Sequence, residues 1–259
     1  MKKGILIVSF GTTYRETREK NIERMVTAVR EAFPDWQVCQ AYSSNTVRNI
    51  LKKRDNLIIP EPREALLQMK EDGITQAAIL PTHIIDGIEN NRMKQTIREC
   101  RDLFTKITTA SVLLDREEDY KAVAKELWEE VKTTAKDTPV IFMGHGSLHE
   151  ADKSYEKLEK ELRSYSRKEI YIATVEGSIT IEPVIERLKA LKRKEKNVLL
   201  MPFMLVAGDH ATNDMAGESD SFASRLRAEG YEARCILKGL GEYKSIRNIY
   251  IEHLKEVLE

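Results

Sequence analysis

Cysteine, net charge and long apolar runs are all scarce in this sequence of 259 residues. The cysteines, Cys39, Cys100 and Cys235, are widely separated and form no C-x-x-C pair, which argues against a disulfide framework and against a zinc site built from thiolates. The 42 Lys and Arg residues balance 42 Asp and Glu residues, so the overall charge favours neither nucleic acid nor an anionic membrane as a partner. We therefore expect a protein of a reducing compartment that recognises charge only locally.

Apolar runs are short throughout the chain. None approaches the roughly 20 residues that a transmembrane helix requires. The first run, residues 4–9, follows two lysines, but it is very short and no small-residue cleavage site comes after it. The sequence therefore predicts a buried first strand there, and a soluble, cytoplasmic protein.

Three common catalytic signatures are also missing. No G-x-x-x-x-G-K-[ST] loop is present, so nothing indicates an ATP-driven motor or a kinase. The pair Gly239 and Gly241 lacks the third glycine of a dinucleotide fingerprint and comes late in the chain, which favours a simple turn. Ser9 and Ser147 lie outside any nucleophile-elbow pattern. We therefore expect no nucleotide cofactor.

Short apolar runs alternate with amphipathic stretches along the whole chain. The runs have the length and composition of buried strands and lie at residues 4–9, 38–42, 77–80, 107–114, 140–143, 170–175, 197–201 and 233–237. Between them, apolar residues recur every three or four positions, as in Ile22, Met25, Val26 and Val29, which predicts helices. This alternation predicts parallel sheets with helices on both faces.

The second half of the chain repeats the scheme of the first. Pro81 and Pro202 each end a predicted strand, and Tyr-Lys pairs begin at Tyr120 and Tyr243 with nearly the same spacing. Such matching offsets indicate an internal duplication. We predict two similar doubly wound α/β domains with parallel sheets that face a central cleft. Their predicted bounds are residues 1–132 and 138–259.

Histidines and a carboxylate follow the predicted strands of the second half. His145 lies between two glycines directly after residues 140–143, Glu176 follows the next strand, and His210 follows the one after that. Ligands bind at the carboxyl ends of strands in open α/β sheets, so these side chains suit a divalent transition metal. The alternative is two separate turn histidines and a surface glutamate. His83 and Glu89 form a comparable pair in the first half, after residues 77–80.

Four segments carry a family resemblance. They are ILIVSFGT at residues 5–12, FMGHG at 142–146, Val175-Glu176, and especially LMPFMLVAGDHATNDM at 200–215. Together they resemble the anaerobic cobalt chelatases of cobalamin synthesis, which are class II chelatases. The resemblance implies two similar α/β domains around a cleft, and insertion of a divalent metal into a tetrapyrrole without ATP.

The resemblance also implies roles for particular residues. His145, Glu176 and His210 match the metal-binding and catalytic set, with His145 as the main base, and the second half would therefore carry the metal site. His83 and Glu89 match two cleft residues that would contact the substrate. We further expect the main chain of Phe10, Gly11 and Thr12, and the side chains of Met204 and Leu205, to contact the tetrapyrrole.

The expected reaction is insertion of Co²⁺ into sirohydrochlorin, or its precorrin-2 form, with cobalt as the substrate metal. Histidine ordinarily titrates near pH 6.5, so an imidazole can both hold the metal and accept a pyrrole proton. Arg15, Arg54 and Arg92 are candidates to bind the carboxylates of the tetrapyrrole. The alternatives are Fe²⁺ or Ni²⁺ as the inserted metal, and a non-catalytic carrier of tetrapyrrole or metal. Homo-oligomerisation is left open.

Overall fold

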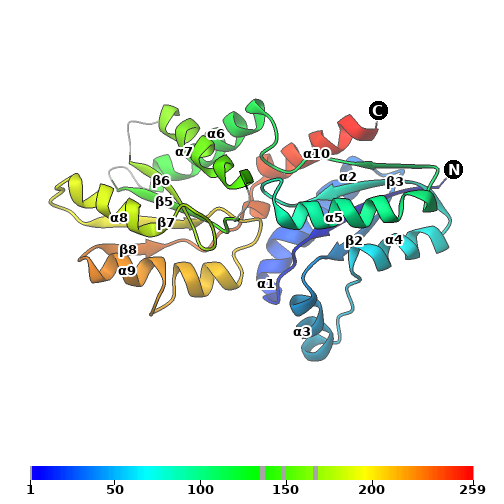
Figure 1. Ribbon diagram of the computed structural model, residues 1–259, viewed down its shortest axis with the longest axis horizontal. Helices are drawn as coiled ribbons and strands as arrows, with labels where there is room; N and C mark the ends of the chain where they lie inside the picture. The colour runs from blue at the N-terminus through cyan, green and yellow to red at the C-terminus, as the bar shows by residue number, and fades with distance from the viewer. Residues whose placement is uncertain (1, 135–137, 148–149, 166–168, 259) are drawn as a thin grey trace. The chain divides into compact units, whose positions relative to one another are not determined.

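The computed structural model describes residues 2–134, 138–147, 150–165 and 169–258, and Figure 1 shows the elements that they form. The chain divides into two compact units. The first consists of Met1–Asp115 with Gly241–Glu259, and the second of Arg116–Leu240. Each unit contains one sheet of four parallel strands. The predicted pair of similar α/β domains is therefore confirmed.

The sheet of the first unit has the strand order β2-β1-β3-β4. Its strands are β1 (Lys2–Ser9), β2 (Gln37–Tyr42), β3 (Ile74–Pro81) and β4 (Lys106–Thr109). Its helical elements are α1 (Arg15–Arg18), the π-helix η1 (Glu19–Glu23), α2 (Arg24–Ala32), α3 (Asn45–Asp55), α4 (Pro62–Glu71), α5 (Ile88–Glu99), the 3₁₀-helix η2 (Arg101–Leu103) and α10 (Lys244–Leu258). One face of the sheet packs against α4 and α5 in a single apolar cluster, while α2 and α10 contact each other and strands of the sheet.

The sheet of the second unit has the equivalent strand order, β6-β5-β7-β8. Its strands are β5 (Val140–Gly144), β6 (Ile170–Thr174), β7 (Asn197–Pro202) and β8 (Glu232–Cys235). Its helical elements are α6 (Glu117–Thr134), the 3₁₀-helix η3 (Glu150–Asp152), α7 (Lys153–Tyr165), α8 (Ile181–Ala190), the π-helix η4 (Ala211–Met215) and α9 (Phe222–Ala228). The 3₁₀-helix η5 (Leu240–Glu242) spans the boundary between the units. Apolar residues of α8 and α9 pack on one face of this sheet, whereas α6 and α7 pack together and α7 contacts β6.

The predicted domain bounds need a correction. Residues 1–132 and 138–259 each contain one sheet, but α6 packs against α7 in the second unit, and α10 packs against β3 and β4 in the first. Each helix that follows a fourth strand therefore belongs to the unit of the other sheet. The apolar stripe of a helix predicts that it will be buried, but the stripe does not identify the surface that covers it. Residues 135–137, between the predicted halves, lie outside the described residues.

The central strands are buried because helices cover both faces of each sheet. Ile5, Leu6, Ile7 and Val8 of β1 are fully buried, and every residue of β5 is buried as well. This explains why both strands read as continuous apolar runs rather than as alternating patterns. Among the described residues, no helix combines the length and the apolar composition that crossing a membrane would require.

Candidate metal centre

His145 is the first residue after β5, so the buried strand carries it to the edge of the sheet. The next residue, Gly146, has a φ of +85°, and a Cβ atom there would lie 2.3 Å from the backbone nitrogen of Gly177. A side chain at position 146 would therefore strain the backbone and collide with the neighbouring loop. Glycine at this position allows the loops that follow β5 and β6 to lie in direct contact beside His145.

Glu176 comes from the second of these loops. Its backbone N–H donates a hydrogen bond to the carbonyl oxygen of His145 over 2.8 Å, which extends the pairing of β5 and β6 beyond the sheet. The side-chain Oε2 of Glu176 lies 3.8 Å from Nε2 of His145. The glutamate side chain is 60% exposed and the histidine side chain 42%, so an ion from solvent can reach both.

His210 directly precedes η4, in the segment that follows β7. Its Nδ1 atom lies 2.6 Å from Oδ2 of Asp214, four residues later. In the same way, Nδ1 of His145 lies 3.0 Å from the carbonyl oxygen of Gly146. A carbonyl oxygen and an ionised carboxylate only accept hydrogen bonds, so Nδ1 is the donor in both contacts, and in a neutral ring Nε2 then carries the lone pair. In that tautomer each imidazole can bind a metal through Nε2.

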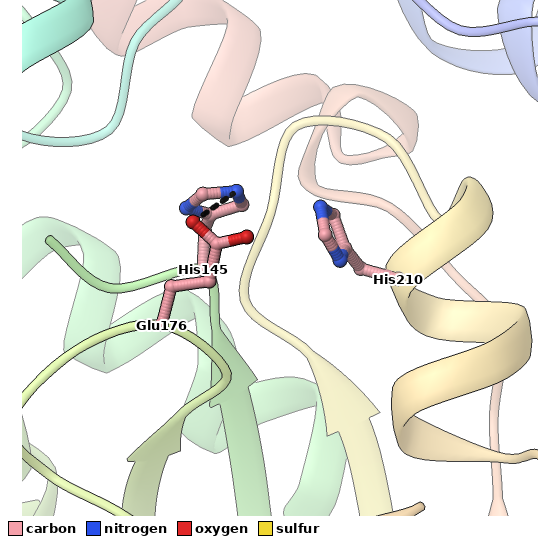
Figure 2. A group of neighbouring side chains, drawn as sticks. All are labelled: His145, Glu176 and His210. Carbon is pink, nitrogen blue, oxygen red and sulfur yellow. Dashed lines mark ion pairs between the residues drawn. The ribbon is translucent and has the colours of Figure 1, made fainter.

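The three side chains converge although His145 and His210 are far apart in the sequence. Figure 2 shows them pointing toward one another from three separate segments. One ligand atom from each lies within 4.8 Å of the others, and the two imidazole rings meet edge to face with their centroids 4.7 Å apart. Ligands of one ion at about 2.1 Å are themselves about 3 to 3.5 Å apart, so modest side-chain rotations would bring all three into one shell. Two imidazoles and one carboxylate suit a first-row divalent ion and leave coordination positions open.

The described residues at the equivalent positions of the first unit are not the same donors. The N–H of Ser44 donates to the carbonyl oxygen of Phe10, just as the N–H of Glu176 donates to that of His145. Phe10 therefore occupies the position of His145, and Ser44 that of Glu176. The matching backbone pattern supports the predicted duplication, while His145, Glu176 and His210, the candidate ligands, all lie in the second unit.

The other predicted substrate contacts are distributed over both units. Phe10 is 46% exposed, whereas Thr12 is buried and Gly11 adopts a φ of +98°. In the second unit, Met204 and Leu205 are only 9% and 8% exposed, and Met204 belongs to the apolar core. The side chains of Met204 and Leu205 thus offer little free surface. A contact between any of these five residues and the substrate stays a prediction.

His83 and Glu89 lie in the first unit, at the segment between β3 and α5 and in α5 itself. Both ring nitrogens of His83 are buried, and neither makes a hydrogen bond of normal geometry within the described residues. This burial lowers the pKa of His83 to about 4, although Asn90 and Asp86 act in the opposite direction. Glu89 pairs with Arg92 over 2.7 Å. Their expected part in substrate binding stays a prediction.

The arginines expected to bind carboxylates already have acidic partners. The pairs are Arg15 with Glu19, Arg54 with Asp55, and Arg92 with Glu89. Exposed pairs of this kind contribute little stability, so a multiply charged ligand can compete for such an arginine.

The low pKa of His83 predicts a loss of stability in mild acid. An unfolded histidine titrates near pH 6.5, so between about pH 6.5 and 4 the unfolded chain binds a proton that the folded chain does not. The free energy of unfolding should be highest above pH 6.5 and fall by up to about 3 kcal/mol as the pH drops to 4. Urea unfolding of the wild type and of His83→Leu at both ends of this range measures the effect. The free energy of unfolding should fall less in the variant than in the wild type. An equal fall in the two proteins would exclude His83 as the cause.

Comparison with known proteins decides the family. A model of the cobalt chelatase family, CbiK, matches residues 3–259. The chain belongs to the cobalt chelatase family. It is 35% identical over 259 residues to the sirohydrochlorin cobaltochelatase of Salmonella typhimurium, with 100% of this chain and 97% of that protein covered. It is 34% identical over 261 residues to the sirohydrochlorin cobaltochelatase CbiKC of Nitratidesulfovibrio vulgaris, with 98% and 89% covered.

Membership in the cobalt chelatase family confirms the resemblance seen in the sequence and the expected enzyme class, a metal chelatase. Solved structures share the fold at lower identity. SirB from Bacillus subtilis with Fe³⁺ aligns with a TM-score of 0.71 at 14% identity, over 99% of this chain and 96% of that one. CbiX, described as the terminal enzyme for biosynthesis of siroheme in denitrifying bacteria, aligns with a TM-score of 0.60 at 13% identity, over 99% and 100%. At these identities the likeness concerns the fold alone.

Sequence reasoning did not single out Asp214, whose carboxylate contacts Nδ1 of His210. A signal was available, because an acidic residue four positions after a histidine lies on the same side of a helical segment. Asp152, which contacts the loops beside His145 and Glu176, had no comparable signal. One of its partners, Ser178, is 26 residues away in the sequence.

Proposed function

We propose that this member of the cobalt chelatase family inserts Co²⁺ into sirohydrochlorin, or its precorrin-2 form, without ATP, as a cytoplasmic step of anaerobic cobalamin biosynthesis. One observation carries the proposal. Two imidazoles whose Nδ1 atoms contact other partners and one carboxylate converge within 4.8 Å, in a chain whose relatives over nearly its whole length are named sirohydrochlorin cobaltochelatase. Cobalt is the substrate metal and the tetrapyrrole is the partner.

In this proposal His145, Glu176 and His210 hold the incoming ion before transfer. A set of three protein ligands leaves positions on Co²⁺ free for the ring nitrogens of the tetrapyrrole. The macrocycle offers four nitrogen ligands, so it outcompetes three side chains that move independently. An open, incomplete shell therefore suits delivery of a metal better than a closed site of four thiolates, which would retain it.

The reaction must also remove protons. Entry of one Co²⁺ into the ring releases two pyrrolic protons, so the charge is balanced if two bases each collect one. Each Nε2 lone pair is freed as the ion leaves, and each can then accept a proton while its Nδ1–H keeps its existing partner. Glu176 and Asp214, which lie beside His145 and His210, would stabilise the imidazolium ions that form. We assign His145 as the main base.

Turnover distinguishes this enzyme from a carrier. Purified protein is mixed with Co²⁺ and a large molar excess of sirohydrochlorin in the absence of ATP, and cobalt-sirohydrochlorin is followed by its absorbance against a protein-free control. We expect many equivalents of product per protein chain. Product that stops at one equivalent would instead indicate a non-catalytic carrier of tetrapyrrole or metal.

The same assay with Fe²⁺ and Ni²⁺ tests the choice of metal. Imidazole and carboxylate ligands accept all three ions, so ligand type alone does not select cobalt. The proposal of a cobalt enzyme rests on the family and predicts the highest rate with Co²⁺. A higher rate with Fe²⁺ or Ni²⁺ would support the proposed chelatase activity but reject cobalt as the inserted metal.

A further inference from the structure

Asp152, at the end of η3, is a buried carboxylate that connects two loops of the second unit. Its side chain is almost inaccessible, with the residue 4% exposed. Oδ1 accepts a hydrogen bond from the backbone N–H of Ser147 over 3.1 Å. Oδ2 accepts two from Ser178, one from the backbone N–H over 2.8 Å and one from the hydroxyl over 2.7 Å. Each oxygen thus binds a different loop.

These two loops are the ones that carry His145 and Glu176. Ser147 is the second residue after His145, and Ser178 is the second residue after Glu176. One side chain therefore sets the separation of two loops at points very close to the proposed ligands. Asp152 itself is absent from the group of proposed ligand residues, so its effect on the metal would be indirect.

Glycine residues make this close arrangement possible. A Cβ atom on Gly177 would lie 2.7 Å from both oxygens of Asp152, and a Cβ atom on Gly146 would lie 2.3 Å from the nitrogen of Gly177. Neither loop could approach the carboxylate as closely if it carried side chains at these positions. The two glycines thus allow the aspartate and both loops to pack closely together.

A carboxylate suits this position better than an amide of the same shape. An ionised carboxylate accepts hydrogen bonds at both oxygens. The three groups that contact Asp152 here, two backbone N–H groups and one hydroxyl, all donate to it. An asparagine side chain has one accepting oxygen, so its NH₂ group would face a donor at one of the two loops. That loop would lose its hydrogen bond to residue 152, and its donor would be repelled by the NH₂ group.

We infer that Asp152 is a positioning residue of the metal centre, which holds the loops of His145 and Glu176 at the spacing that one Co²⁺ ion requires. This inference rests on the ligand set of the proposed function. Groups that orient metal ligands commonly change metal affinity by about 10- to 100-fold when they are replaced.

The test compares Asp152→Asn with a matched control, Glu159→Gln, in the full-length protein. Glu159 is also a largely buried carboxylate of the second unit: it accepts the N–H of Ile172 over 2.7 Å and pairs with Arg163 and Arg187, but it binds neither ligand loop. Isothermal titration with Co²⁺ alone, and thermal unfolding without metal, are measured for both variants. We expect Co²⁺ affinity to fall by about 10-fold or more in Asp152→Asn and by less than about twofold in Glu159→Gln, at comparable losses of stability.

The inference is overturned if Asp152→Asn binds Co²⁺ as the wild type does, or if affinity falls equally in the two variants. Should Asp152→Asn fail to fold, Ser178→Ala tests the same contact, because it removes one of the three donors and leaves the carboxylate in place. We expect that variant to bind Co²⁺ about fivefold more weakly. Affinity unchanged in Ser178→Ala would then reject the positioning role.

A double-mutant cycle with His145→Ala tests whether Asp152 acts through the ligand. Asp152→Asn should weaken Co²⁺ binding much less when His145 is already absent, because the two effects share one cause. Equal effects in both backgrounds would contradict the inference. These titrations contain no tetrapyrrole, so they are independent of turnover. If the effects of Asp152→Asn and His145→Ala on Co²⁺ affinity are coupled but turnover is absent, the proposed function alone is rejected. If turnover is normal but the two effects are not coupled, the role of Asp152 alone is rejected.

Discussion

Replacement of His145 by alanine is expected to reduce cobalt insertion into sirohydrochlorin by about 1,000-fold or more. The substitution removes a proposed metal ligand and the proposed main proton acceptor in one step. The fold should persist, because the side chain is 42% exposed and its ring makes a hydrogen bond to the carbonyl oxygen of the adjacent Gly146 rather than to a distant element. The rate is measured from the absorbance of the product, and circular dichroism during heating reports on the fold.

Glu186→Ala provides the control for this experiment, since that side chain is 71% exposed on α8 and pairs with Lys189. It should retain the wild-type rate. Formation of cobalt-sirohydrochlorin by His145→Ala at a rate near that of the control would remove His145 from the mechanism.

The second large effect is expected in the binding of Co²⁺ by the protein alone. His210→Ala should raise the dissociation constant by about 100-fold, because one of three ligands is lost. Asp214→Asn should raise it by about tenfold, because the ligand remains but the carboxylate 2.6 Å from its Nδ1 atom is replaced. Isothermal titration of the wild type and the two variants measures this graded series.

The sizes of the two increases in the dissociation constant distinguish a ligand from a residue that orients it. If His210→Ala binds Co²⁺ as tightly as the wild type, His210 is not a ligand and the convergence of the rings has another cause. If Asp214→Asn alone matches the wild type, the imidazole is oriented by its position before η4 rather than by the carboxylate.

The two units differ in the residue that follows their first strand. Both sheets deliver a residue at the same place after their first strand, but Phe10 stands in the first unit where His145 stands in the second. Phenylalanine cannot ligate a metal, and at 46% exposure it presents an apolar ring to its surroundings. The two similar units thus share one backbone hydrogen-bond pattern after their first strands, while a histidine follows that strand in the second unit alone.

Much of the architecture could be predicted from the sequence because buried strands and amphipathic helices have distinct apolar patterns. The continuous runs in β1 and β5 predicted strands covered on both faces, and Pro62 predicted the start of α4. The candidate site was predicted in the same way, since strand ends in a parallel sheet lie at one edge. His145, Glu176 and His210 follow β5, β6 and β7, which pair side by side.

By itself, then, the sequence determined the order of strands and helices, the parallel sheets and the three side chains that the strand ends deliver. Only the tertiary structure decided that α6 and α10 pack in the unit of the other sheet, because an apolar stripe does not specify its partner. It also decided the role of Asp152, whose hydrogen bonds join loops that are distant in the sequence. Periodic patterns record burial, whereas contacts between loops depend on backbone positions that no local pattern encodes.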